Sequence, residues 1–351
     1  MNFYRTPASR VIHGTMLKCM LSIITIFLSL HFIGLHKPCS KNPQPVTPSN
    51  SSDMADHREP IGREGLDEYP RRLKMLRSFG DNMCHFKVTG DVYQFGVFEG
   101  TTLKQIKGTF PSNFIWGFDS FQGLPEETKS VPRLQHWSSG QYNATFKGVT
   151  MEGLTRSFGG PDEVQFVKGF YNESLNADTV ESFLPRRMAP ALYVDIDCDL
   201  YISTVHSLDW MFREGLIQVG TLIGYDDWWV VPCASHRRQD KIGKYVSPRA
   251  EQVMGRPAVD VYAHGGEAQA HREMSVKYNV RFRCVCGPCA SNMVHTHTDW
   301  RPYFVVEAMG PGVTPDHGFT MTADDVVKWT SSNRNCIFHY RRSFDYVSTE
   351  E

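Results

Sequence analysis

Short apolar runs recur between residues 92 and 309, and each has the length of a β-strand. They lie at residues 92–98, 113–119, 163–169, 191–197, 221–227, 280–286 and 302–309. Segments of helical length lie between several of them, at residues 101–108, 149–158, 174–183 and 267–278. A further helix is indicated by apolar residues at three- and four-residue spacing: Val205, Leu208, Phe212 and Leu216. Strands that alternate with helices imply βαβ crossovers, so we expect an α/β fold with a mainly parallel sheet and helices on both faces.

The first sixty residues follow a different pattern. Residues 19–35 form a mostly apolar run at the short limit for a membrane-spanning helix. Basic side chains precede this run and no acidic residue occurs before Asp53, which by the positive-inside rule places the N-terminus in the cytosol. We therefore expect residues 1–37 to be a cytosolic tail with a signal-anchor helix, typical of a type II membrane protein of the ER or Golgi. The alternative is a cleaved signal peptide or a transit sequence, which would make the protein secreted or organellar.

Composition limits the remainder of the chain. Residues 38–62 are a Pro/Ser-rich stem, residues 63–310 carry the strand and helix pattern, and residues 311–351 are a polar extension in which we expect irregular structure. Hydrophobic residues at 41% and charged residues at 21% exclude a disordered chain and a polytopic membrane protein. The formal net charge of −1 indicates no nucleic-acid partner.

Glycines follow the first predicted strand, in Gly96-Val-Phe-Glu-Gly100-Thr-Thr. Glycine at a strand-to-helix turn lets the backbone approach a ligand, and ligands of such sheets bind at the carboxyl ends of the strands. The turn has neither the Gly-x-Gly-x-x-Gly nor the Gly-Lys-Ser/Thr pattern, which argues against a dinucleotide or a triphosphate. A tight turn without a ligand is equally consistent. Asp119 ends the second strand, where it could accept both hydroxyls of a ribose or cap a turn.

Acidic residues gather after the fourth and fifth predicted strands. Asp195, Asp197 and Asp199 lie within five residues, and Asp226-Asp227 ends the next strand. Carboxylates this close repel one another unless a cation or hydrogen-bond donors neutralise them. Converging carboxylate oxygens suit a hard divalent ion such as Mg²⁺, so a metal site is predicted here. The alternative is a set of caps and solvated acids.

Five segments occur in the order found in one enzyme family. They are Phe95-Gly-Val-Phe-Glu-Gly-Thr, Phe118-Asp-Ser-Phe-Gln-Gly-Leu-Pro-Glu, Val167-Lys-Gly-Phe-Tyr-Asn-Glu-Ser-Leu, Asp197-Cys-Asp-Leu-Tyr-Ile-Ser-Thr and Asp226-Asp227. This order resembles the macrocin O-methyltransferase-like (TylF-like) family of class I S-adenosylmethionine-dependent methyltransferases. The resemblance spans roughly residues 85–310, so it implies that residues 63–310 are a methyltransferase domain.

The resemblance also implies a fold, cofactors and site residues. The fold would be a seven-stranded Rossmann-like sheet with an antiparallel last strand, and a homodimer is compatible with it. S-adenosyl-L-methionine would lie over the glycine turn. The residues expected to bind it are Gln94, Gly96, Glu99, Gly100, Thr101, Asp119, Ser120, Gly169 and Asp195. The expected Mg²⁺ ligands are Asp197, Asp226 and Asp227. Gln94 and Asp195 depart from the family pattern, because many methyltransferases carry an acid at the first position and relatives often carry another polar residue at the second.

Methyl transfer from a sulfonium is an in-line displacement, so catalysis requires an aligned and deprotonated acceptor hydroxyl. A sugar or another small hydroxylated compound is the expected acceptor, from the family alone. The candidates for the general base are Asp227, His206 and His136. Three tryptophans could form an apolar or sugar-stacking wall over the acceptor, or could equally belong to the core: Trp137, Trp228 and Trp229.

Cysteines cluster in Cys284-Val-Cys-Gly-Pro-Cys289, with His295 and His297 further on. This set could suggest zinc, but its spacing is not that of a common four-ligand site. A local disulfide or free thiols are favoured.

Two other functions remain open from the sequence. A membrane anchor, a stem and an Asp-x-Asp motif also describe many Golgi glycosyltransferases, although these features leave the glycine turn and the Asp119 segment unexplained. The second alternative is a binding protein that kept the methyltransferase fold and lost turnover, for which Gln94 is the only hint.

Overall fold

The computed structural model describes residues 89–127, 137–183, 186–229, 266–290 and 300–332. The expected signal anchor in residues 1–37 and the stem in residues 38–62 lie outside this range and stay predictions. In the described part of the chain, no helix has the length and apolar character needed to cross a membrane.

Seven strands form one sheet in the order β3-β2-β1-β4-β5-β7-β6. They are β1 (Asp91–Phe95), β2 (Ile115–Asp119), β3 (Val164–Lys168), β4 (Ala191–Ile196), β5 (Leu222–Tyr225), β6 (Val280–Cys286) and β7 (Tyr303–Met309). The first five pair in parallel, whereas β7 lies antiparallel between β5 and β6. Each strand overlaps its predicted apolar run, so the expected Rossmann-like α/β fold is confirmed.

Most helices overlap the predicted segments. The helices are α3 (Thr101–Thr109), α4 (Met151–Ser157), α5 (Tyr171–Ser174), α6 (Ala177–Glu181), α7 (Tyr201–Arg213), α11 (Gly266–Lys277) and α12 (Ala323–Ser332), with a short 3₁₀ turn at Thr145–Lys147. Of these, α5 and α12 were not predicted. The single helix predicted for residues 174–183 is divided at Asn176. Its side chain accepts from the Thr179 amide and forms a capping box, so it starts a new helix.

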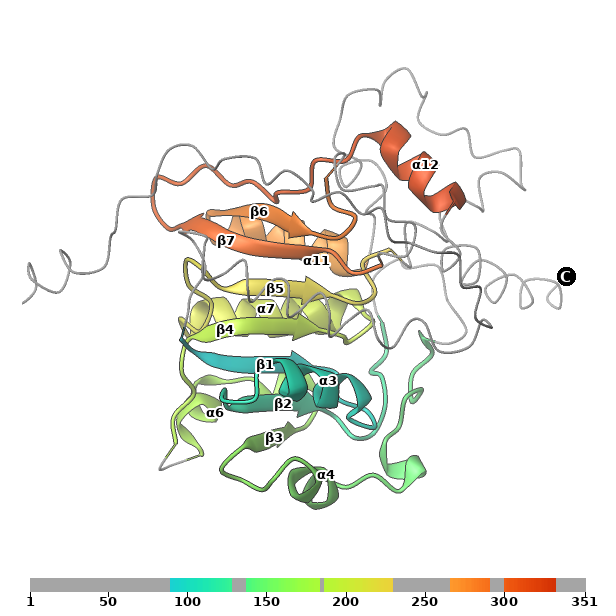
Figure 1. Ribbon diagram of the computed structural model, residues 1–351, viewed down its shortest axis with the longest axis vertical. Helices are drawn as coiled ribbons and strands as arrows, with labels where there is room; N and C mark the ends of the chain where they lie inside the picture. Colours follow the sequence, from blue (N-terminus) through green and yellow to red (C-terminus); the bar gives the residue numbers. More distant parts are fainter. Residues whose placement is uncertain (1–88, 128–136, 184–185, 230–265, 291–299, 333–351) are drawn as a thin grey trace, which may run out of the picture. The chain divides into compact units, whose positions relative to one another are not determined.

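Alternating side chains along the strands build two apolar cores, one on each face of the sheet. Tyr93 and Phe95 pack with α7 and α11, which lie behind the sheet in Figure 1. Val92 points to the other face and packs with Leu103 and Ile106 of α3, which lies in front. Both faces are therefore buried, as a parallel sheet requires.

Part of the C-terminal extension is ordered, in contrast to the irregular structure expected for residues 311–351. Asp316 pairs with the edge strand β6, because its carbonyl accepts from the Phe282 amide at 2.7 Å and its amide donates to the Val280 carbonyl at 3.0 Å. Trp329 of α12 is only 2% exposed and packs in the same core as α7. The polar composition of the segment hid a few apolar residues that close this edge of the core.

A buried carboxylate lies at the amino end of the parallel strands. Asp91, 4% exposed, accepts hydrogen bonds from Trp116 Nε1 at 2.8 Å, Arg186 Nη2 at 2.8 Å and the Ala189 amide at 3.1 Å. The Arg186 guanidinium also stacks over the ring of Phe114, 3.8 Å from its centroid. Every contact of this acid ties β1 to a neighbouring segment.

A disulfide joins Cys284 of β6 to Cys289, so the local bridge is the one of the two expected states that is observed for this pair. Cys286 and Cys198 are buried and are not part of this bridge. His295 and His297, the other members of the zinc alternative, lie outside the described residues. The closed turn packs against the start of β7, where a Cβ on Gly287 would lie 2.0 Å from the Arg301 carbonyl oxygen. Gly287 has a φ of +80°, so only glycine fits this turn without strain.

Candidate active site

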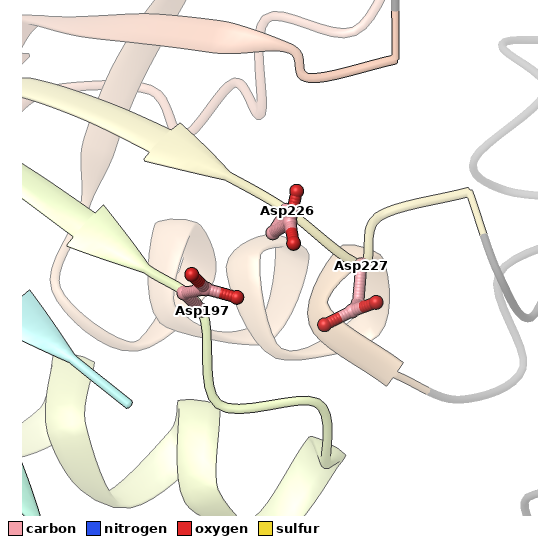
Figure 2. A group of neighbouring side chains, drawn as sticks. All are labelled: Asp197, Asp226 and Asp227. Atoms are coloured by element: carbon pink, nitrogen blue, oxygen red, sulfur yellow. The ribbon is translucent and has the colours of Figure 1, made fainter. Parts of the chain in front are cut away.

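Three aspartates meet at the carboxyl ends of β4 and β5. The two strands pair in parallel, with Ile196 opposite Tyr225, and the Asp226 amide extends the pairing by donating to the Ile196 carbonyl at 2.9 Å. Asp197 therefore lies beside Asp226 and Asp227 (Figure 2). One carboxylate oxygen from each of the three lies within 4.8 Å of the others. The structure thus brings the three predicted metal ligands together.

Negative charge accumulates at this end of the sheet. Burial raises the pKa of Asp197 well above its usual range, and the neighbouring Asp226 raises it further, while Arg301 opposes the shift. Burial likewise raises the pKa of Asp227, with Asp199 and Asp226 as the repelling charges. Such a cluster is stable as carboxylates only when a cation compensates it.

Arg301 provides part of this compensation. Its Nε lies 2.7 Å from Asp226 Oδ1, its Nη1 lies 3.3 Å from Asp195 Oδ1 and its Nη2 lies 3.7 Å from Asp197 Oδ2. Arg301 was not predicted from the sequence. Its position could have been inferred, because an antiparallel strand begins at the edge of the sheet where the parallel strands end, and Arg301 lies two residues before β7.

Glu267, in the first turn of α11, is a further acid that the sequence analysis missed. It is fully buried, and its Oε2 accepts from the Asp227 amide at 2.9 Å. No described residue bonds its buried Oε1. Burial raises its pKa well above the usual range, and Asp227 and Asp226 raise it further. A carboxylate oxygen without a donor beside three other acids indicates that the cluster has room for more positive charge.

A cavity of about 370 Å³ adjoins the acidic cluster. Most of the predicted residues line it: Gly96, Glu99, Thr101, Asp119, Ser120, Gly169, Asp197, Asp226 and Asp227. Gly96 has a φ of +89°, and a Cβ there would lie 1.7 Å from the Asp197 carbonyl oxygen. Only glycine lets the turn after β1 pass this close to the end of β4, so the glycine turn and the acids share one cavity.

Asp119 accepts more hydrogen bonds from the protein itself than the sequence predicted. Its Oδ2 accepts from the Val97 and Phe98 amides at 2.8 and 2.9 Å, and its Oδ1 accepts from the Phe121 amide at 2.6 Å. A carboxylate oxygen has two lone pairs, so Oδ2 is saturated and Oδ1 keeps one acceptor direction. Asp119 is thus the cap of two turns, and at most one direction remains for a ribose hydroxyl.

Several predicted residues lie away from the cavity. Gln94 and Asp195 are fully buried within the strands and bond to each other, Gln94 Nε2 donating to Asp195 Oδ2 at 3.2 Å. Gly100 is the left-handed cap before α3 and does not line the cavity. His206 on α7 does not line it either, and burial lowers the pKa of its imidazole. His136 lies outside the described residues.

The three tryptophans follow the core alternative, because none of them lines the cavity. Trp228 and Trp229 are 2% and 1% exposed and pack in the core against Phe319. Trp137 is buried too, beside Leu124 and Leu200. The aromatic side chains that do line the cavity are Phe98, Tyr142, Phe170, Tyr171 and Trp300.

Asp199 also lines the cavity, although the sequence analysis noted it only as part of the acidic run. Its backbone is left-handed, with a φ of +64°, a conformation that aspartate tolerates better than most residues. Burial raises its pKa well above the usual range, and Asp197 raises it further, while a hydrogen bond with Trp137 opposes the shift. The strained turn after β4 therefore presents a second acid beside Asp197.

A family model described as macrocin-O-methyltransferase (TylF) matches residues 69–246, just over half of the chain. The matched segment contains β1 to β5 and all the aspartates of the cluster. No curated protein matches the sequence significantly.

Solved structures with a similar fold include "the O-methyltransferase NovP", 21% identical over 51% of this chain and 73% of that one, with a TM-score of 0.35. Another is the "SAH-bound Podospora anserina methyltransferase PaMTH1", 10% identical over 70% of this chain and 89% of that one, with a TM-score of 0.33.

Proposed function

Since the chain belongs to the macrocin O-methyltransferase (TylF) family and is an S-adenosylmethionine-dependent O-methyltransferase, we propose that it methylates a hydroxyl of a sugar or another small molecule with the assistance of Mg²⁺. Family membership accounts for the glycine turn and the Asp119 segment, which a glycosyltransferase with an Asp-x-Asp motif leaves unexplained. It also favours an enzyme over a binding protein without turnover.

One observation supports the proposal above all others. Asp197, Asp226 and Asp227 form one wall of the same cavity that the Gly96 turn lines. All-oxygen donor sets suit Mg²⁺, and the buried, unpartnered Glu267 Oε1 fits a site with a deficit of positive charge. When bound, S-adenosylmethionine supplies an electrophilic methyl group and Mg²⁺ lowers the pKa of a coordinated hydroxyl.

The residues of the chain then have separate tasks. Gly96 and Gly169 keep the cofactor side of the cavity open, and the carboxylates orient the acceptor oxygen. For the general base, Asp227 lines the cavity and His206 does not. Asp199 is a second candidate, because it lines the cavity beside the three predicted metal ligands.

Aromatic side chains support the proposed acceptor class. Tyr142 and Trp300 line the cavity along with the acids. Flat rings beside carboxylates suit a ligand with an apolar face and hydroxyl groups, such as a sugar or a hydroxylated ring. Screening of candidate acceptors for methyl transfer would identify the compound.

The test uses the full-length protein. Calorimetry should show S-adenosylhomocysteine binding both with Mg²⁺ and with a chelator. Transfer of a labelled methyl group from S-adenosylmethionine to compounds of a glycan or metabolite extract should occur with Mg²⁺ and stop with the chelator. Transfer that continues in the chelator would overturn the metal role, and binding of nucleoside diphosphates in place of S-adenosylhomocysteine would overturn the reaction class.

We further propose that the domain works in an oxidising compartment, as expected for a type II protein of the ER or Golgi. The bridge between Cys284 and Cys289 supports this location, because structural disulfides are rare in the cytosol. Protease protection of the domain in sealed microsomes would support it, and digestion without detergent would overturn it.

A further inference from the structure

The side chain of Arg301 is held by buried residues that do not line the cavity. Its Nη1 pairs with Asp195, which is fully buried. Asp195 is itself held by the Tyr193 hydroxyl, which donates to Oδ1 at 2.6 Å, and by Gln94 Nε2, which donates to Oδ2 at 3.2 Å. Two of the residues predicted to bind the cofactor, Gln94 and Asp195, therefore anchor a guanidinium instead.

The backbone of Arg301 is held as firmly as its side chain. The turn at Gly287 approaches its carbonyl oxygen so closely that a Cβ there would lie 2.0 Å away, and the bridge between Cys284 and Cys289 closes that turn. Arg301 also lies two residues before β7, whose first residue, Tyr303, pairs with Gly224. The guanidinium is thus held at the acidic cluster and has little freedom to withdraw.

The guanidinium contacts two carboxylates that the proposed metal also requires. Arg301 Nε lies 2.7 Å from Asp226 Oδ1, and Nη2 lies 3.7 Å from Asp197 Oδ2. Both aspartates belong to the three carboxylates that converge within 4.8 Å. A full positive charge therefore lies at the rim of the site in which a second cation is expected.

We propose that Arg301 is a built-in cation that competes with Mg²⁺ for Asp226 and weakens metal binding. This inference rests on the proposed function, since it concerns the same metal site. In the metal-free protein Arg301 compensates part of the negative charge of the cluster. The metal therefore exchanges with the solution, and turnover follows the Mg²⁺ concentration.

Two opposing effects decide the sign of the test. Removing Arg301 takes away a hydrogen bond that orients Asp226, which would weaken metal binding. It also removes a positive charge a few ångströms from a divalent ion in a partly buried site, which strengthens metal binding. The charge effect is larger here, because the Asp226 amide is bonded to Ile196 and the Asp227 amide to Glu267, so other contacts keep the acids in place.

The experiment measures Mn²⁺ and Mg²⁺ affinity by calorimetry in the full-length protein, without acceptor. Arg301→Gln should bind either ion at least tenfold more tightly than the wild type. Arg301→Lys keeps the charge and should stay within about threefold. Arg186→Gln, which removes the arginine paired with the buried Asp91 at the other end of the strands, should leave ion affinity unchanged. S-adenosylhomocysteine affinity should change by less than a few-fold in all three variants.

Thermal unfolding gives a second readout. Arg301→Gln should melt at a lower temperature than the wild type in chelator and should regain that loss with Mg²⁺, because the ion then replaces the missing charge. A variant that folds only with Mg²⁺ present also supports the inference.

Equal or weaker ion binding by Arg301→Gln would overturn the inference while the metal site stands. A variant that stays unfolded with Mg²⁺ present would overturn it as well. If neither the wild type nor Arg301→Gln binds any divalent ion while both bind S-adenosylhomocysteine, the proposed metal role falls and the inference falls with it.

Discussion

The two ends of the parallel strands hold buried carboxylates in opposite ways. At the amino end, Asp91 is matched by three donors, among them Arg186. At the carboxyl end, Arg301 pairs with Asp195, Asp197 and Asp226, and Asp227 lies beside them. Asp195 and Glu267 are fully buried there, whereas the side chains of Asp197 and Asp226 are 20% and 30% exposed. The two ends differ in the balance of charge, because several acids share one guanidinium among the described residues of the carboxyl end.

This difference separates structural from functional acids. A buried carboxylate with a full set of donors stabilises the fold, and removing it leaves those donors unpaired. A cluster with too few donors costs stability, and a protein keeps it only for a ligand that supplies the missing charge. The balance of donors, and not burial itself, marks the active site in this sheet.

The largest expected effect comes from removing an acid at the carboxyl end. Asp197→Ala should lower Mg²⁺-dependent methyl transfer by roughly a thousandfold, because the hydroxyl loses its oriented metal. Its affinity for S-adenosylhomocysteine should stay within a few-fold of the wild type, as measured by calorimetry. Activity that survives this substitution in chelator would show that the acids have no metal role.

The same kind of change at the amino end should affect stability instead. Asp91→Ala leaves the buried Trp116 Nε1 and the Ala189 amide without their acceptor, so we expect a loss of about 3 kcal/mol in the free energy of unfolding. Urea denaturation measures it. Arg186→Gln should cost less, because Arg186 is 44% exposed, so water screens its ion pair, and Asp91 keeps the Trp116 and Ala189 donors. A stable Asp91→Ala protein with altered metal affinity would contradict the comparison.

A third test breaks a matched group by pH alone. His271 is fully buried, with Nδ1 facing the Tyr225 hydroxyl at 2.7 Å and Nε2 facing the His317 carbonyl at 2.8 Å. Burial lowers the pKa of His271 to about 3, from its usual value of 6.5. As the pH falls below 6.5, the imidazole therefore takes up a proton in the unfolded chain but not in the folded chain. Stability is therefore lost as the pH falls below 6.5.

Between pH 6.5 and 5 the wild type should lose about 2 kcal/mol more than His271→Phe, since each pH unit contributes about 1.4 kcal/mol per proton. The acidic cluster acts in the opposite direction, but both proteins share it, so the difference isolates His271. Denaturation curves at several pH values measure the two slopes. Parallel slopes would mean that His271 is protonated in the folded state.

The smallest effect should have the unusual sign. Asp227→Asn removes one charge from the cluster and keeps the backbone amide that donates to Glu267, so we expect the variant to gain about 1 kcal/mol of stability in chelator. Mg²⁺ should stabilise the wild type more than the variant. The difference between their free energies of unfolding should therefore shrink or change sign. A variant less stable than the wild type in chelator would show that the cluster is already balanced.

Strand positions could be predicted because each strand is a compact apolar run, and the acids could be predicted because they end such runs. Asp197 and Asp226 meet only because β4 neighbours β5, which the common topology of these sheets already suggested. The family resemblance, confirmed by the family match, added the cofactor but misplaced Gln94 and Asp195. Those two lie on buried strand positions. The sequence places Arg301 near this edge of the sheet, but it does not show that the guanidinium pairs with Asp195.

The site residues that could not be predicted come mainly from segments far from the acids in the chain. Glu267 opens a helix and looks like an ordinary first-turn acid, so nothing local reveals that it bonds the Asp227 amide. Two tryptophans are the opposite case, since they lie near the site in the sequence but not in the fold. Trp228 and Trp229 directly follow the acids in sequence, but the chain turns after β5 and carries them into the core.

The three amides on Asp119 have a consequence for ligand entry. Val97, Phe98 and Phe121 belong to two separate turns, and one carboxylate fixes them before any ligand arrives. A donor molecule therefore meets a rigid cradle, and little conformational entropy is lost on binding there. Amide hydrogen exchange at these three positions should be slow in the ligand-free protein and should slow little further when the cavity is filled.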